Sequence, residues 1–140
     1  MSESKTVVVL GGGVGGVVTA RELRKRLPRQ HRVVLIDREP EHLFAPSLLW
    51  LMVGLRRPES IKRPLSRLKR KGIEVRLGEV EKIDAEARRV TVAGEAIAAD
   101  YLVVSLGAEL APETIPGLQE AGHNFYTLPG AERLRDALSS

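Results

Sequence analysis

A glycine-rich turn between an apolar strand and a helix constrains this chain more than any other feature of its sequence. Val7 to Leu10 is a short β-branched run, typical of a buried parallel strand, and glycine follows it directly. Gly11, Gly13 and Gly16 then give the spacing Gly-x-Gly-x-x-Gly. There the first glycine permits a tight turn, the second lets the backbone approach a pyrophosphate, and the third lets the helix pack closely on the strands. Free N–H groups and the helix dipole also favour an anion at this place.

The residues around these glycines predict a β-α-β unit over residues 6–37. Pro28 ends the expected helix, and Val33 to Ile36 forms a second buried strand. Within the helix we expect one apolar face and one basic face. The apolar face is Val14, Val17, Val18, Leu23 and Leu27, and the basic face is Arg21, Arg24 and Lys25.

Asp37 ends the second strand about 20 residues beyond the last glycine, where a carboxylate accepts a hydrogen bond from a ribose hydroxyl. Its alternative interpretation is a solvated strand-end carboxylate. The neighbouring Arg38 either reaches a phosphate or is simply exposed. A bare glycine motif is weak, but the strand, the helix and the acidic residue together favour dinucleotide binding.

The next part of the chain predicts shorter elements. The connection Arg38–Lys62 is long, and a short helix is expected to begin at Pro64, with Leu65 and Leu68 inward and Gly72 at its end. Residues 74–97 alternate apolar and polar side chains and predict short antiparallel strands, with a tight turn at residues 93–94.

The last part predicts one more buried strand and one more helix. Tyr101 to Leu106 is the strand, and Gly107 halts it. A proline- and glycine-containing loop leads to the helix, which is expected over Ala131 to Leu138.

Two separated motifs resemble the pyridine nucleotide–disulfide oxidoreductase superfamily. VVVLGGGVGGVVTAREL, Val7 to Leu23, is similar to its FAD fingerprint, and DYLVVSLGA, Asp100 to Ala108, to its second flavin-domain motif. The resemblance implies FAD, bound through its ADP part at the start of the first helix. Val80 would be the strand residue whose backbone meets the adenine. The implied cofactor-binding residues are Gly11, Gly13, Val14, Gly15, Gly16, Asp37, Arg38, Val80, Ser105, Leu106 and Gly107.

The segment HLFAPSLLWLMVG, His42 to Gly54, narrows this resemblance. Disulfide reductases carry a cysteine pair in the helix that follows this point, and this chain has no cysteine. The segment is similar instead to sulfide:quinone and type II NADH:quinone oxidoreductases, which have a His-x-Phe-x-Pro pattern here. For the complete enzyme this implies electron transfer from sulfide or NADH to a quinone. No residue of this chain is assigned a catalytic role.

The fold implied is α/β: a Rossmann-like FAD-binding domain of three layers, with a β-meander crossover over Glu74 to Ile97. An NAD-binding domain would continue by helical crossovers instead. Only one Gly-x-Gly-x-x-Gly is present. We therefore expect residues 1–140 to be an incomplete, amino-terminal part of the FAD domain, with the NAD-like domain and the carboxy-terminal half beyond residue 140.

The composition of the chain argues against several other kinds of site and function. Without cysteine there is no disulfide, thiolate zinc site or cysteine redox centre, and the distant His42 and His123 predict no metal site. Aromatic residues make up 4% of the chain, too few for a nucleic-acid stacking platform. The longest apolar stretch, Leu43 to Leu55, has 13 residues. A membrane span needs about 20, so we expect a cytoplasmic protein.

Two surface segments and two other functions stay open. The basic run Lys62 to Lys71 is either a solvated helix face or a peripheral contact with the anionic inner face of a membrane. The apolar run Leu48 to Leu55 is core or an intersubunit contact, and a homodimer is expected. The alternative functions are an NAD-binding Rossmann enzyme without flavin and a non-catalytic nucleotide-binding or interaction module.

Overall fold

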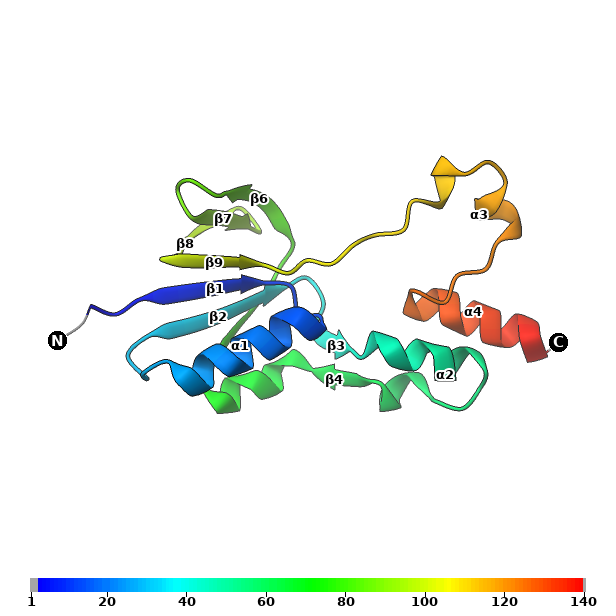
Figure 1. Ribbon diagram of the computed structural model, residues 1–140, viewed down its shortest axis with the longest axis horizontal. Coiled ribbons are helices and arrows are strands. Elements are labelled where there is room, and N and C mark those ends of the chain that lie inside the picture. Colours follow the sequence, from blue (N-terminus) through cyan, green and yellow to red (C-terminus); the bar gives the residue numbers. More distant parts are fainter. Residues whose placement is uncertain (1–2, 140) are drawn as a thin grey trace. The chain divides into compact units, whose positions relative to one another are not determined.

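The computed structural model of the protein describes residues 3–139 (Figure 1). The chain divides into two compact units. The first unit contains the described residues up to His42 together with Pro64–Gly107, and the second contains Leu43–Arg63 and the described residues from Ala108 onward. Each unit has its own apolar core.

A parallel sheet of four strands, ordered β5-β2-β1-β9, forms the centre of the first unit (Figure 1). The strands are β1 (Thr6–Leu10), β2 (Arg32–Asp37), β5 (Glu74–Leu77) and β9 (Tyr101–Val104). The register aligns Leu10 with Ile36 on one side and with Val104 on the other. The carboxyl ends of β1, β2 and β9 therefore meet at one edge of the sheet.

Helix α1 (Val14–Arg26) and the 3-10 helix η3 (Leu65–Lys71) cover one face of this sheet. Side chains alternate between the faces of a strand, so Val9, Val33 and Leu35 point toward the helices. There they pack with buried residues of the helical layer, which are Ala20, Leu65 and Leu68.

The short helix predicted near Pro64 is confirmed as η3. Pro64 is its N-cap, and Gly72, with φ of 83°, ends it in the left-handed conformation. Leu65 and Leu68 are buried as predicted.

An antiparallel meander covers the other face of the sheet (Figure 1). Its strands are β6 (Val80–Asp84), β7 (Arg89–Val92) and β8 (Glu95–Ala98). Val90 and Val92 pack against the side chains that point away from the helices: Val8, Leu10, Val34 and Ile36. Ala93 and Gly94 both have positive φ, 49° and 76°, as a tight hairpin turn requires. The prediction of three layers with a meander crossover is confirmed.

One strand of the expected meander belongs elsewhere. β5 was predicted to pair antiparallel with its successors, but it pairs in parallel with β2 at the edge of the main sheet. The turn at Gly72 brings Val75 beside Leu35, against the helical layer. An ion pair of 2.7 Å between Arg32 and Glu74 joins the first residues of the two strands.

The buried face of α1 agrees with the prediction in part, since Val17, Leu23 and Leu27 pack against the core. Val14 and Val18 are 45% and 54% exposed, whereas Gly16, Ala20 and Arg24 are buried. These three buried residues are spaced four apart and face the strands. The first two are small because the amino-terminal part of the helix lies close to the strands.

Arg24, placed on the basic outer face by its charge, lies at the buried end of this stripe. Its guanidinium donates to three carbonyl oxygens beyond the helix, those of Leu27, Pro28 and His31, at 2.6–2.8 Å.

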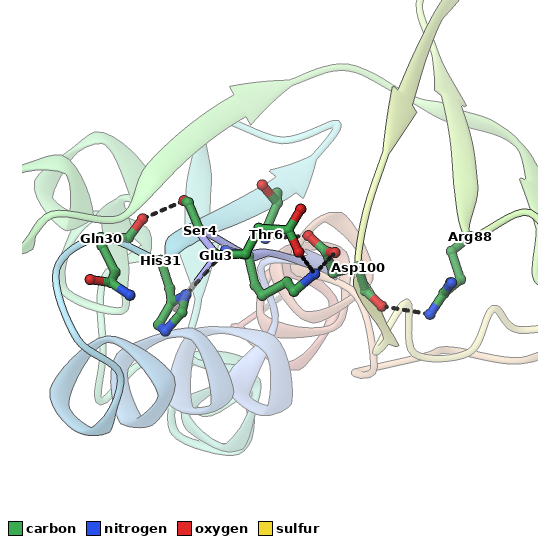
Figure 2. Close-up of polar contacts among 8 residues, drawn as sticks. Glu3, Ser4, Thr6, Gln30, His31, Arg88 and Asp100 are labelled. Atoms are coloured by element: carbon green, nitrogen blue, oxygen red, sulfur yellow. Dashed lines mark hydrogen bonds and ion pairs between the residues drawn. The ribbon is translucent and has the colours of Figure 1, made fainter. Parts of the chain in front are cut away.

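Polar contacts hold the amino-terminal edge of the sheet together (Figure 2). The backbone N–H of Thr6 donates to Asp100 Oδ2 at 2.7 Å, and the backbone N–H of Lys5 donates to His31 Nδ1 at 3.1 Å. The guanidinium of Arg88 donates to the carbonyl oxygen of Asp100 at 3.2 Å. The Thr6 hydrogen bond, assisted by the Lys5 ammonium, lowers the pKa of the Asp100 carboxyl.

The second unit is built from short helices. They are η1 (Ala45–Ser47), α2 (Leu48–Met52), η2 (Pro58–Ser60), η4 (Pro112–Thr114), α3 (Leu118–Ala121) and α4 (Leu128–Ser139). α2 packs on α4 around Leu48, Leu51, Ile61 and Ala131. The last predicted helix is confirmed as α4, which begins three residues before Ala131. The region 38–62 was predicted only as a connection, but it contains three helices and the strand β3 (Glu41–Leu43), which pairs with β4 (Lys62–Pro64).

Candidate functional site

The turn between β1 and α1 lies at the edge where the strands β1, β2 and β9 end (Figure 1). The backbone N–H of Gly11 donates to the carbonyl oxygen of Ile36 at 2.8 Å, which continues the ladder between β1 and β2. Gly11 then has φ of 101°, a value that side chains strongly disfavour. The chain thereby turns directly from the strand into the helix.

Close backbone approaches explain two of the glycines. A β-carbon on Gly16 would overlap the carbonyl oxygen of Gly11, and a β-carbon on Gly11 would overlap the carbonyl group of Ser105. Gly11 therefore permits contact with the end of β9, and Gly16 permits contact between α1 and the turn.

Gly13 faces open space. It is the N-cap of α1 with φ of −69°, and no protein atom lies within 4 Å of the position of a β-carbon on it. Among the described residues no side chain caps this helix end, and the first turn, which includes Val14 and Gly15, contains no acidic residue. N–H groups at such an end are suited to an anion.

Asp37 lies beside the turn and is held by the backbone. Its Oδ2 accepts a hydrogen bond from the N–H of Gly12, and its Oδ1 accepts one from the N–H of Glu39 at 2.7 Å. Its carbonyl oxygen accepts a third from the N–H of Gly78 at 2.9 Å. Each carboxylate oxygen has a second lone pair, so the side chain can still accept from a hydroxyl group.

Ser105, Leu106 and Gly107 follow β9 at the same edge. The N–H of Ser105 donates to the carbonyl oxygen of Leu10 at 2.8 Å. A β-carbon on Gly15 would come to 2.7 Å from Ser105 Oγ, so the serine hydroxyl lies against the first turn of α1. β9 itself ends at Val104, two residues before the predicted end, because the chain leaves the sheet through Leu106 and Gly107, whose φ is 80°.

The two remaining predicted residues are Arg38 and Val80, and both lie within two residues of a contact of the Asp37 backbone. Arg38 follows Asp37, is 58% exposed at its side chain, and forms an ion pair of 4.0 Å with Glu39. Val80 is half-buried at the start of β6, two residues after Gly78, which is bonded to Asp37.

Two residues of the cluster were missed by sequence reasoning. Gly12 has its N–H bonded to Asp37, and its carbonyl oxygen lies 2.8 Å from Nδ1 of His42. His42 was considered as a metal ligand and as the first residue of the His-x-Phe-x-Pro segment, but not as a partner of the glycine turn. The available signal was its place shortly after Asp37, where the chain is still close to the glycine turn.

Comparison with known proteins agrees with this geometry. Residues 5–140 match the pyridine nucleotide-disulphide oxidoreductase family. A sulfide-quinone reductase of Aquifex aeolicus is 41% identical over 109 residues, which are 76% of this chain and 25% of that protein. A demethylphylloquinone reductase of Synechocystis sp. is 33% identical over 143 residues, 96% of this chain and 35% of that protein.

Solved structures give the same result. The X-ray structure of the Aquifex aeolicus sulfide:quinone oxidoreductase matches with a TM-score of 0.90 and 36% identity, over 97% of this chain and 32% of that one. This chain thus spans between a quarter and about a third of the length of these relatives. The family consists of FAD-dependent oxidoreductases. From the match over nearly its whole length, the chain belongs to the pyridine nucleotide-disulphide oxidoreductase family.

Proposed function

We propose that this chain binds the ADP part of FAD at the carboxyl ends of β1, β2 and β9, as part of a flavoprotein oxidoreductase. One observation carries the proposal: the open amino-terminal end of α1 and the carboxylate of Asp37 lie on either side of the same turn and are joined through Gly12. The first suits a pyrophosphate and the second a ribose, and in FAD the ribose of the adenosine part is joined directly to the pyrophosphate.

The residues divide into three groups by the part of FAD that they contact. The N–H groups from Gly13 to Gly15 receive the pyrophosphate, with Val14 in the same turn, and Gly11 and Gly16 give this turn its shape. Asp37 accepts from the ribose, Arg38 stands next to it, and the backbone of Val80 meets the adenine. Ser105, Leu106 and Gly107 lie toward the flavin nucleotide. When bound, FAD supplies the electron-pair transfer, and these residues bind and orient it.

The electron donor and acceptor belong to the proposal for the whole protein. The relatives are named as reductases of quinones, with sulfide or NAD(P)H in several names. We propose that the whole protein passes electrons from sulfide or NADH to a quinone. The test is flavin bleaching in the whole protein under anaerobic conditions: sulfide or NADH must bleach the flavin, and a quinone must restore its absorbance. No bleaching by either donor would refute this part alone.

The binding proposal is tested with the chain itself. FAD is titrated into the purified chain, and the flavin absorption bands that remain after removal of excess are measured, with NAD titrated separately. Gly13→Val should abolish FAD retention with little loss of stability, because a β-carbon on residue 13 would meet no neighbouring atom within 4 Å and φ is ordinary. The control, Ala96→Val on the exposed surface of β8, should bind like the wild type.

Each result has a distinct meaning. Binding of FAD that Gly13→Val abolishes supports the proposal. Binding of NAD but not FAD supports the alternative of a Rossmann protein without flavin. Absence of binding to both, with the fold intact by circular dichroism, would refute FAD binding by this chain on its own and would leave its family membership unchanged.

We propose further that the apolar surface of α2 contacts a second copy of the chain. Leu49, Trp50 and Val53 are 49–53% exposed, and Leu55, just beyond the helix, is 67% exposed. An apolar patch of this kind favours association. Sedimentation should show a dimer that the double substitution Trp50→Ser, Leu55→Ser dissociates, whereas a monomer at all concentrations refutes the homodimer.

The basic side of η3 is the surface proposed for a peripheral membrane contact. Arg67, Lys69, Arg70 and Lys71 are all exposed along this short helix. Among residues 3–139 no helix combines the length and the apolar character needed to cross a bilayer. Vesicles containing anionic lipid should bind the chain at low salt, and replacing Lys69, Arg70 and Lys71 by glutamine should abolish binding. Equal binding to neutral vesicles would refute a contact with anionic lipid, and with it the proposed place at the inner face of the membrane.

A further inference from the structure

The backbone of Gly12 is held by side chains on both of its polar atoms. Its N–H donates to Oδ2 of Asp37, at the end of β2, and its carbonyl oxygen lies 2.8 Å from Nδ1 of His42, in β3. Because a carbonyl oxygen only accepts, Nδ1 of His42 must carry a proton and donate it. A β-carbon on residue 12 would lie 2.7 Å from Leu65 Cδ1 and 3.1 Å from Asp37 Oδ2, so a side chain there would require these neighbours to shift.

The hydrogen bond from His42 determines the direction of the next N–H group. The carbonyl oxygen of Gly12 and the N–H of Gly13 belong to one planar, trans peptide unit, so they point in opposite directions. With the oxygen held by His42, the N–H of Gly13 points away from the imidazole. Gly13 is exposed at the amino-terminal end of α1, with open space where a β-carbon on it would lie.

We propose that His42 is a positioning residue for the cofactor: by holding the Gly12 carbonyl, it directs the Gly13 N–H toward the pyrophosphate. This inference rests on the proposed function, because it requires that FAD binds at this turn. His42 acts through the peptide and contacts no reacting atom. A peptide free to rotate would lose the N–H donor for part of the time, and the cost of orienting it would weaken binding.

A merely structural role for His42 predicts a different outcome. In that case its removal lowers the stability of the protein, and any change in FAD affinity follows the loss of fold. A positioning role instead lowers FAD affinity in protein that remains fully folded, and the affinity returns when a donor is restored at the same place. The two readouts are therefore measured together for each variant.

The experiment compares two substitutions of His42. His42→Phe keeps a ring but removes the donor, and His42→Asn restores an N–H at about the position of Nδ1. FAD and ADP dissociation constants are measured by titration, and the unfolding midpoint of the ligand-free chain is measured alongside. We expect His42→Phe to weaken both ligands by roughly five- to tenfold, the effect of one net hydrogen bond, and His42→Asn to recover most of this.

His31 gives a matched control at the opposite edge of the sheet (Figure 2). Its Nδ1 also contacts the backbone, accepting from the N–H of Lys5 at 3.1 Å. His31→Phe therefore also removes a hydrogen bond between an imidazole nitrogen and the backbone, here one that the nitrogen accepts, at a place remote from the turn. It should change stability and leave FAD affinity as in the wild type.

The outcomes separate this inference from the proposed function. If the wild type binds FAD and His42→Phe binds equally well, the positioning role is overturned and the proposed function stands. If His42→Asn fails to recover the affinity while the fold is intact, the role is likewise overturned. If the wild type binds neither ligand, the proposed function fails, and the nitrogen chemical shifts of His42 decide on the hydrogen bond: a proton on Nδ1 supports it, and a proton on Nε2 alone overturns it.

Discussion

The carbonyl group of Ser105 lies where a β-carbon on Gly11 would have to be. The two residues belong to motifs far apart in the sequence, one at the start of the glycine turn and the other at the end of β9. Ser105 is also bonded through its N–H to the carbonyl oxygen of Leu10 at 2.8 Å. The two flavin-associated motifs therefore form one structural unit, and a change in either alters the other.

Gly11→Ala should destabilise the chain and remove cofactor binding together. The substitution forces a side chain into a conformation with φ of 101° and against the Ser105 carbonyl group. We expect a loss of about 2–4 kcal/mol in the free energy of unfolding, combining backbone strain with steric overlap. Urea denaturation measures this loss.

Gly94→Ala is the control for the strain alone. Gly94 has φ of 76° in the hairpin turn, but nothing lies within 4 Å of a β-carbon on it. Its substitution should cost about 1 kcal/mol. Equal losses for the two variants would show that the contact with Ser105 contributes nothing.

Arg24→Met should strongly destabilise the chain. The sequence predicted Arg24 on the basic outer face of α1, but its side chain is buried. The residue is 8% exposed, and its guanidinium satisfies three carbonyl oxygens where α1 ends. Methionine fills similar space but leaves these acceptors unpaired, so we expect a loss of about 2–4 kcal/mol. Arg26→Met, at a side chain 81% exposed, is the control and should change stability by less than about 0.5 kcal/mol. Similar thermal midpoints for both variants would contradict this account.

The sequence predicted β1, β2 and the glycine turn correctly because local chemistry determines them. The β-branched run of β1 is buried by neighbours on both sides, and Gly11 is required by one backbone angle. The inward face of α1 was predicted correctly at Val17, Leu23 and Leu27, and incorrectly at Val14 and Val18, because hydrophobicity was taken as the guide to burial. Close packing selected small residues at Gly16 and Ala20 instead, and left Val18 exposed.

The site was predictable only as far as its motifs extend. Spacing alone placed Asp37 beside the glycines. The hydrogen bond from His42 depends on how β3 returns toward the turn, and the place of His42 shortly after Asp37 indicates proximity but not this contact. β5 was wrongly predicted to belong to the antiparallel meander for a similar reason. Its alternating side chains suit an edge strand of either sheet, and its parallel pairing with β2 depends on the tertiary structure.

Ala20→Leu should test the close packing of α1 on the sheet. Ala20 is fully buried among Val9, Val33 and Leu35. A larger side chain would push the helix away, with an expected loss of about 1–3 kcal/mol. Val18→Leu, on the exposed side of the same helix, should be nearly neutral. The comparison is read from urea midpoints, and a destabilisation only at position 18 would reverse the assigned faces.

Stability should fall with acid partly through Asp100. The Thr6 N–H, and then Lys5 at 3.3 Å, lower the pKa of this carboxyl in the folded chain. A group whose pKa is lower in the folded state binds its proton more tightly when unfolded. Its contribution is therefore complete above the unfolded pKa of about 3.9 and is lost as the pH falls through the folded pKa.

Asp100→Asn isolates this contribution, because asparagine keeps an acceptor for the Thr6 N–H without the charge. The free energy of unfolding is measured from neutral pH down to strongly acidic pH for both proteins. We expect the variant to be less stable at neutral pH and the difference to shrink in acid, below the unfolded pKa. Glu113→Gln, at an exposed position of the second unit, should follow the wild type throughout. A difference between wild type and Asp100→Asn that stays constant with pH would mean that the carboxylate charge does not hold the start of β1.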